Sequence, residues 1–140
     1  MLRLMVIDDE LPARRGLKRL LQAHENVDIV GEASSLDEAQ ELAQVLRPDA
    51  LFLDIDLGGD DGFALIDRLD PVPAIVFVTA HSTYAPQAFD VAAVDFLLKP
   101  VDEQRLALTL ERLRHHRRSL QHAGRPSIGN EPKLAIQAKR

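Results

Sequence analysis

The chain has 140 residues, of which 46% are hydrophobic, and a formal net charge of -5 at pH 7. This length is typical of one domain, and the apolar content is sufficient for a packed core, which excludes a disordered chain. No cysteine is present, so disulfide frameworks and thiolate metal sites are excluded. The longest apolar runs cover about half a dozen residues, far short of the roughly 20 that cross a bilayer. No signal peptide is evident at the N-terminus, and we expect a cytoplasmic protein with no membrane partner.

The charges are distributed unevenly. From Arg112 onward there are eight lysines and arginines against one acid, Glu131, so the body is acidic and the tail is basic. After Gly124 the composition turns to proline, glycine, serine and asparagine, which is typical of a linker. We therefore expect a domain over residues 1–120 and a linker or tail over residues 121–140. Alternatively, the basic tail leads towards a nucleic-acid-binding module.

Short apolar runs alternate with helical patterns, which indicates successive βα units and a parallel sheet. The expected strands cover residues 4–7, 27–33, 50–53, 73–78 and 94–98. Helices are expected from Pro12, from Ser35, shortly after Gly62, over residues 84–91, and through Leu106, Leu110 and Leu113. Five such units predict an α/β fold, a flavodoxin-like doubly wound five-stranded parallel sheet of order 2-1-3-4-5 with helices on both faces.

Local signals set several helix boundaries. Pro12 suits the first turn of the first helix. Ser35 and Glu38 have the spacing of a capping box that opens the second helix, and Pro48 ends it. Pro86 is compatible with the fourth helix only if it lies in the first turn.

Polar side chains stand where four of the strands end. Asp8 and Asp9 follow the first, Asp54 closes the run of residues 51–54, Thr79 follows the fourth, and Lys99 follows the fifth. In open α/β sheets the carboxyl ends of the strands hold the functional site. A lone Asp or Thr after a strand is usually a helix cap, but four such ends together predict one site.

This set of residues is suited to phosphoryl transfer. Two unit charges 4 Å apart repel by about 4 kcal/mol at an effective dielectric of 20, so three converging carboxylates need a cation. Oxygen ligands favour a hard ion such as Mg²⁺, and Lys99 adds a fixed positive charge. Asp54 is the best nucleophile candidate because carboxylates form acyl phosphates. Thr79 and Lys99 could then hold the transferred group.

Four segments carry a family resemblance, namely residues 6–10 (VIDDE), 51–56 (LFLDID), 78–80 (VTA) and 95–100 (DFLLKP). In this order and spacing they closely resemble the receiver domain of bacterial two-component response regulators, over about residues 2–118. The resemblance implies a phosphoacceptor, not an enzyme with a separate substrate, which catalyses only its own phosphorylation and dephosphorylation. Asp54 would take its phosphoryl group from a sensor histidine kinase.

The resemblance also implies roles for individual residues. Asp9 and Asp54 would bind Mg²⁺ directly, Asp56 through its backbone carbonyl, and Asp8 mostly through water. Thr79 and Lys99 would hold the phosphate, and Phe96, with Thr79, would form the conformational switch. The fourth helix, fifth strand and fifth helix would be the homodimer face, and Lys99-Pro100 would be a cis peptide.

Residues 77–81, Tyr84, 88–89 and 94–100 look most like LytTR-type regulators, which carry a mostly β DNA-binding domain after the receiver. This chain is too short to contain that domain, so DNA contact and control of transcription would need it. Residues 133–138 could be its first strand or simply a tail.

Two departures from the receiver pattern stand out. The loop after Asp54 has glycine where proline is usual, and Asp56 adds a further acid beside the site. Phe96 stands where tyrosine is also common, so no hydroxyl is available there.

Three alternatives remain open. Residues 51–56 also resemble the nucleophile motif of haloacid-dehalogenase-type phosphatases, although Asp8 and Asp9 precede it where that family's metal-binding acids follow. A flavin-binding protein of the same fold would need a Ser/Thr-rich phosphate loop after the first strand, where this chain has acids. A pseudo-receiver that binds partners without phosphate would usually lack part of the site, which here is complete.

Overall fold

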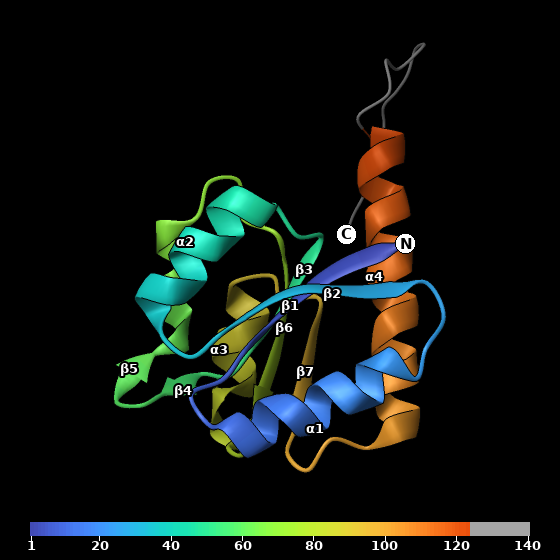
Figure 1. Ribbon diagram of the computed structural model, residues 1–140. Helices are drawn as coiled ribbons and strands as arrows, with labels where there is room; N and C mark the ends of the chain where they lie inside the picture. The colour runs from blue at the N-terminus through green and yellow to red at the C-terminus, as the bar shows by residue number, and fades with distance from the viewer. Residues whose placement is uncertain (124–140) are drawn as a thin grey trace.

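The computed structural model describes residues 1–123 (Figure 1). Its main sheet contains β1 (Leu2–Ile7), β2 (Val27–Ala33), β3 (Ala50–Leu53), β6 (Ala74–Thr79) and β7 (Asp95–Leu98). All neighbouring strands are parallel, and their order is β2-β1-β3-β6-β7. Counted in chain order these five strands run 2-1-3-4-5, which confirms the predicted fold.

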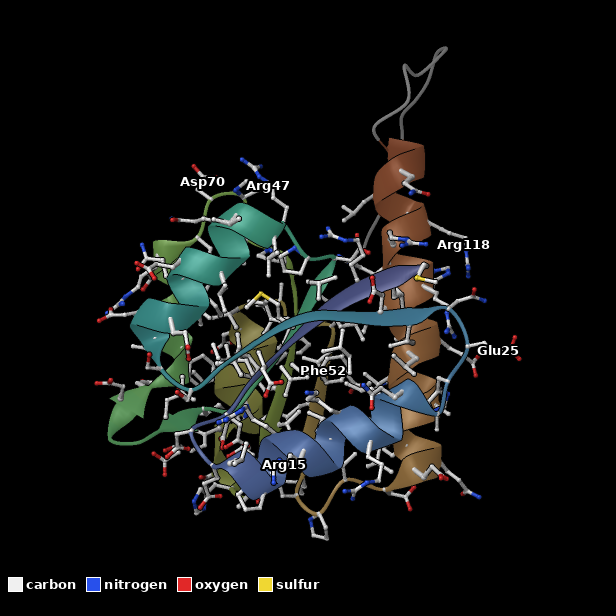
Figure 2. All side chains as sticks on the ribbon, in the orientation of Figure 1. Arg15, Glu25, Arg47, Phe52, Asp70 and Arg118 are labelled. Atoms are coloured by element: carbon white, nitrogen blue, oxygen red, sulfur yellow. The ribbon has the colours of Figure 1, made fainter. Side chains whose placement is uncertain are left out.

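Helices cover both faces of this sheet, as expected. They are α1 (Leu11–Gln22), α2 (Leu36–Leu46), the 3₁₀ helices η1 (Gly62–Arg68) and η2 (Ser82–Tyr84), α3 (Ala85–Asp90) and α4 (Glu103–Ala123). Alternate residues of β1 enter different cores, because successive strand side chains point to opposite faces. Leu4 and Val6 pack with α1 and α4, whereas Met5 and Ile7 pack with α2, η1 and α3. Phe52 lies within the first of these cores (Figure 2).

The second helix begins with a modified capping box. The Ser35 hydroxyl accepts from the Glu38 amide at 3.2 Å, as predicted, but the Glu38 carboxylate accepts from the amide of Ser34 at 2.7 Å. The reciprocal bond is therefore displaced by one residue. At the other end Arg47 is left-handed, with φ 50°, and its amide bonds the Ala43 carbonyl at 3.0 Å. Pro48 follows directly, as expected of a helix stop.

The segment after Asp54 contains an element that the sequence analysis missed. Residues Asp56–Leu57 (β4) and Asp60–Asp61 (β5) form a two-stranded antiparallel hairpin. Its turn is Gly58-Gly59, with φ of 60° and 99°, as hairpin turns with positive φ require. The Asp61 carboxylate then accepts from the Phe63 amide at 2.9 Å and opens η1. The short helix expected here is present, as a 3₁₀ helix.

A buried ion network joins β7 to α4. The Asp95 carboxylate accepts from Arg105 at 2.7 and 2.5 Å, from the Thr109 hydroxyl at 2.7 Å and from Arg112 at 3.0 Å. The amide of Phe96 donates to the same carboxylate at 2.8 Å. Burial favours the neutral acid, but these hydrogen bonds outweigh it and lower the pKa of Asp95 to about 2. The network therefore fixes the start of α4 against the strand that precedes Lys99.

The second half of α4 is fixed to the opposite edge of the sheet. Arg114 donates to the Glu25 carbonyl at 3.0 Å. Arg117 donates to the Met1 carbonyl at 2.5 Å and to Asp49 at 3.2 Å. The last turns of α4 extend past the edge where β1 begins (Figure 1). Residues 121–123 of the predicted linker are the last residues of α4. The rest of that linker, the possible strand at residues 133–138 and the basic residues from Arg125 onward lie outside the described residues.

Two further expectations concern the backbone and the membrane. The Lys99-Pro100 peptide is cis, as the resemblance implied, and Asp70-Pro71 is cis as well. Among residues 1–123, no helix has both the length and the apolar character needed to cross a membrane.

Candidate functional site

Three carboxylates meet at the C-terminal edge of the sheet. Ligand atoms of Asp8, Asp9 and Asp54 all lie within 4.8 Å of one another. The strand pairing brings them together, because Ile7 at the end of β1 is paired with Leu53 at the end of β3. The ladder continues one residue further, since the Asp54 amide donates to the Ile7 carbonyl at 2.9 Å. The acids predicted to converge therefore do so, with Asp8 and Asp54 buried and Asp9 exposed.

Lys99 bridges two of these acids. Its ammonium lies 2.7 Å from Asp8 Oδ2 and 2.8 Å from Asp54 Oδ2. Burial raises the pKa of Asp54, and its partial share of one lysine does not offset this effect. Burial alone would lower the pKa of Lys99, but the bonds to Asp54 and Asp8 outweigh it and raise that pKa. Lys99 therefore stays protonated. Its single positive charge does not balance the negative charges of the three carboxylates.

Thr79 and Phe96 lie on the two strands next to this cluster. Thr79 is fully buried at the end of β6, its hydroxyl accepts from the His81 amide at 3.4 Å, and its carbonyl accepts from the Lys99 amide at 2.8 Å. Phe96 on β7 is half-buried and is paired in register with Phe77. Phe96 also lines a cavity of about 380 Å³ beside η2 and α3. The structure thus places the two expected switch residues on adjacent strands.

The hairpin after Asp54 lies against the site. The Asp56 amide donates to Asp54 Oδ1 at 3.1 Å, and the Gly62 amide donates to the Ile55 carbonyl at 2.6 Å. Hydrogen-bonded and non-bonded pairs alternate along an antiparallel ladder, so the next pair, Asp56 with Asp61, leaves the Asp56 carbonyl outside the ladder. That carbonyl remains available as a ligand.

Gly62 is a residue that the sequence analysis did not recognise as structurally required. A Cβ at this position would lie 2.3 Å from the Asp54 carbonyl oxygen and 2.9 Å from the Ile55 Cα. Only glycine therefore allows the end of the hairpin to approach the backbone of Asp54. Gly58 has a related place, because a Cβ there would lie 3.4 Å from Asp9 Oδ2. The sequence showed these glycines only as a loop signal.

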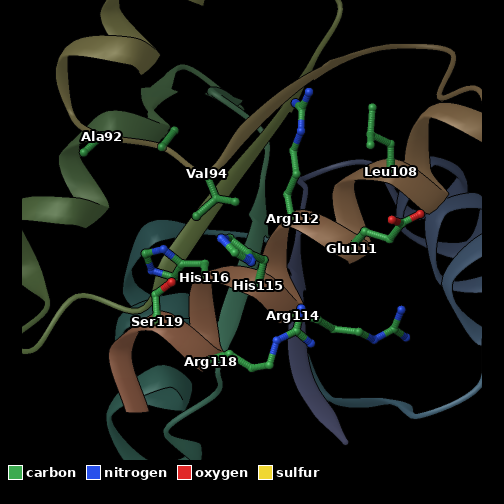
Figure 3. Close-up of a pocket in the computed structure, with 11 residues that line it drawn as sticks. Ala92, Val94, Leu108, Glu111, Arg112, Arg114, His115, His116, Arg118 and Ser119 are labelled. Carbon is green, nitrogen blue, oxygen red and sulfur yellow. The ribbon is translucent and has the colours of Figure 1, made fainter. Parts of the chain in front are cut away.

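A separate groove of about 700 Å³ lies between the segment before β7 and the second half of α4 (Figure 3). Val94, Leu108, Arg112, His115 and Arg118 are among its lining residues. Val94 precedes β7 whereas Lys99 follows it, so the groove is at the other end of the strand from the carboxylates. It is not part of the candidate site.

Comparison with known proteins decides the family. Residues 4–111 match the family model described as "Response regulator receiver domain". The chain belongs to this family. The phosphatase and flavin-protein alternatives are thereby set aside, and this receiver is a phosphoacceptor, not an enzyme acting on a separate substrate.

Similar proteins include LytTR-type regulators, as the sequence resemblance indicated. The receiver is 45% identical over 122 residues to the sensory transduction protein LytT of Bacillus cereus, covering 85% of this chain and 50% of that protein. It is also 45% identical over 119 residues to the transcriptional regulatory protein BtsR of Escherichia coli K12, covering 84% and 50%. The chain thus spans about half the length of these relatives. Among solved structures, the response regulatory domain of protein mrkE from Klebsiella pneumoniae is similar, with a TM-score of 0.75, 32% identity, and coverage of 84% of this chain and 98% of that one.

Proposed function

We propose that this receiver accepts a phosphoryl group on Asp54 from a phosphohistidine of a sensor histidine kinase. The observation that carries the proposal is the bridge from Lys99 to Asp54 and Asp8 at 2.8 and 2.7 Å, inside a cluster of three carboxylates. An isolated aspartate after a strand would need no such bridge. The arrangement instead presents a buried carboxylate beside a fixed cation, as transfer of an anionic group requires.

In this proposal the hydrogen bonds of Asp54 orient it for attack. Lys99 holds Oδ2 and the Asp56 amide holds Oδ1, so the carboxylate cannot rotate freely. A carboxylate oxygen forms the new bond to phosphorus while the bond from phosphorus to the histidine nitrogen breaks, and the released imidazole takes up a proton. Lys99 then donates to one phosphoryl oxygen. The Thr79 hydroxyl, at the end of the neighbouring strand β6, would donate to another.

The donor set also fits Mg²⁺. With Lys99 charged, the three carboxylates leave this cluster with two uncompensated negative charges, which a divalent cation would neutralise. Asp9 and Asp54 would hold the ion directly, Asp56 through its free carbonyl, and Asp8 through water. When bound, the ion would stabilise negative charge on the transferring group.

The output that we propose rests on the relatives of this receiver and on the exposed apolar residues of one of its surfaces. Phosphorylation would shift Thr79 and Phe96 and change the surface made by α3, β7 and α4, where Phe89 is 83% and Leu98 47% exposed. A homodimer would form through this surface. By analogy with the transcriptional regulatory protein BtsR, of whose length this chain covers about half, we propose a cytoplasmic regulator of transcription whose DNA contacts come from a further domain. The division into a receiver at residues 1–120 and a linker at 121–140 belongs to the same proposal.

Intact-protein mass spectrometry after incubation with acetyl phosphate tests this function. We expect a gain of one phosphoryl group that requires Mg²⁺ and is absent in Asp54→Asn. Asp60→Asn, which removes an exposed acid of the same hairpin, is the matched control and should be labelled like the wild type. Labelling at another residue would contradict the role of Asp54. No labelling at all would favour the pseudo-receiver alternative.

A further inference from the structure

Arg14, in the first turns of α1, reaches back to the acidic pair. Its guanidinium donates to the backbone carbonyl of Asp8 at 2.7 Å, and it also bonds the Glu32 carboxylate on β2 at 3.1 Å. The Arg14 side chain is only 14% exposed, so this is not a solvated surface arginine. Lys18, one turn further along α1, holds the other Glu32 oxygen at 2.5 Å. Arg14 is thus fixed between the second strand and the end of the first.

This contact controls the peptide that joins the two acids. The carbonyl of Asp8 and the amide of Asp9 belong to one planar peptide unit, so a bond that orients the first also orients the second. The amide of Asp8 is fixed independently by the Ala33 carbonyl of β2 at 3.0 Å. With both ends of Asp8 held, the direction in which the chain presents Asp9 is set.

The contacts around Asp9 form a closed ring. The Asp8 carboxylate accepts from the Glu10 amide at 2.9 Å, and the Glu10 carbonyl accepts from the Arg14 amide at 3.0 Å. The Arg14 guanidinium then returns to the Asp8 carbonyl. Asp9 lies within this ring and, like Glu10, is exposed, so its backbone is held by these contacts while its carboxylate faces solvent.

We infer that Arg14 is a positioning residue that holds the Asp8-Asp9 peptide and thereby aims the Asp9 carboxylate at the proposed cation. This inference rests on the proposed function, because it presumes that Mg²⁺ binds the acidic cluster. Arginine suits the task, since its planar group can serve Asp8 and Glu32 together, whereas a lysine is a single point of charge. Glu32 keeps Arg14 in place and is held in its ionised form by Lys18, whose hydrogen bond lowers the pKa of Glu32.

Charge and position predict opposite results for Arg14→Gln. Removing a positive charge near an acidic cluster would strengthen Mg²⁺ binding if charge alone mattered. Loss of positioning would weaken it, and residues that orient metal ligands typically contribute about 10- to 100-fold in affinity. We expect Arg14→Gln to weaken binding about 10-fold. Arg14→Lys should recover part of this loss, because it restores one of the two contacts.

The experiment measures the Mg²⁺ dissociation constant by calorimetry at fixed ionic strength. Arg15→Gln is the matched control, since it removes the same charge from the exposed residue next along α1 (Figure 2) and should bind Mg²⁺ like the wild type. Without Mg²⁺, amide hydrogen exchange over residues 8–13 should be faster in Arg14→Gln than in the control. The Mg²⁺ concentration for half-maximal labelling by acetyl phosphate should rise by the same factor as the dissociation constant.

The outcomes separate this inference from the proposed function. If the wild type and Arg15→Gln bind Mg²⁺ and Arg14→Gln binds it equally well or more tightly, the positioning role is refuted and the receiver chemistry stands. If the wild type itself neither binds Mg²⁺ nor is labelled, the proposed function fails and this inference fails with it. Should Arg14→Gln not fold, Arg14→Lys decides the question because it leaves the charge unchanged. Weaker Mg²⁺ binding than in the wild type would then support the positioning role, and equal binding would refute it.

Discussion

Replacing Asp95 with asparagine removes the charge from the buried network between β7 and α4. The Asp95 side chain is 4% exposed and is contacted by Arg105, Thr109, Arg112 and the Phe96 amide. Asparagine has almost the same volume and keeps an oxygen for some of these donors. The substitution therefore isolates the contribution of the charge from that of packing.

The pKa of Asp95 gives the size and sign of the effect. An acid whose pKa is 3.8 in the unfolded chain and about 2 in the folded one contributes stability that is fully present above the higher value and is lost as the pH falls through the lower. At about 1.36 kcal/mol per pKa unit, this amounts to about 2 kcal/mol at pH 7 and about 1 kcal/mol at pH 3. Arg105 and Arg112, at 37% and 47% exposure, can rehydrate after the substitution. The loss should therefore stay below the 3–5 kcal/mol typical of a fully buried orphaned charge.

Urea unfolding at pH 7 and pH 3 measures this contribution. We expect Asp95→Asn to lower the free energy of unfolding by about 2 kcal/mol at pH 7 and by roughly half of that at pH 3. Asp90→Asn, at an exposed acid on α3, is the control and should change it by less than about 0.5 kcal/mol. An equal loss at both pH values, or a loss at pH 7 no larger than that of the control, would refute the electrostatic account of this network.

Three further predictions concern a glycine beside the site, the site itself and a helix cap. Gly62→Ala should destabilise the protein by about 2 kcal/mol in urea unfolding, because the new Cβ would meet the Asp54 backbone. Gly16→Ala, inside α1 with nothing within 4 Å of its Cβ, should instead stabilise it by about 0.5–1 kcal/mol, and equal effects would contradict the steric argument. Asp54→Asn should raise the melting temperature in EDTA at pH 7. Because the pKa of Asp54 is raised in the folded state, its ionisation destabilises the fold, and this cost is present once the pH exceeds the folded pKa. A lower melting temperature in the variant would contradict this argument. Ser35→Ala should cost about 1 kcal/mol in urea unfolding through loss of the helix cap, and no change would show that the Ser34–Glu38 bond suffices.

The sequence was most informative where a rule of backbone geometry connects the position of a residue in the chain to its location in the fold. Parallel strands align their carboxyl ends, so acids after β1 and β3 had to meet. The strand order follows from five successive βα units, and the core positions of Leu106 and Leu110 follow from helical spacing. The hairpin at residues 56–61 was missed because the Gly58-Gly59 turn is flanked by acids instead of alternating apolar residues. Like charges at Asp56 and Asp61, directly opposite each other, argue against a hairpin from sequence alone.

Arginine partners could not be predicted for a different reason. Arg14 and Arg105 lie on amphipathic helices, where a basic residue is typical of a solvated face. Their acceptors are a backbone carbonyl at a strand end and a buried carboxylate on another strand. Such contacts depend on how helices cross the sheet, and helix propensity and hydrophobic pattern do not contain that information. The roles assigned to individual site residues remain predictions that the substitutions above test.

The length of α4 gives the receiver a mechanical property. Its 21 residues span about 30 Å, and the network at Asp95 holds one end while Arg114 and Arg117 hold the middle at the far edge of the sheet. With both sets of contacts in place, α4 cannot pivot freely about its first turn. If the contacts of Arg114 and Arg117 were released, a tilt of about 10° at that turn would displace Ala123 by about 5 Å. Arg114 and Arg117 therefore limit how far the end of α4 at Ala123 can swing, and removal of their contacts would enlarge that movement.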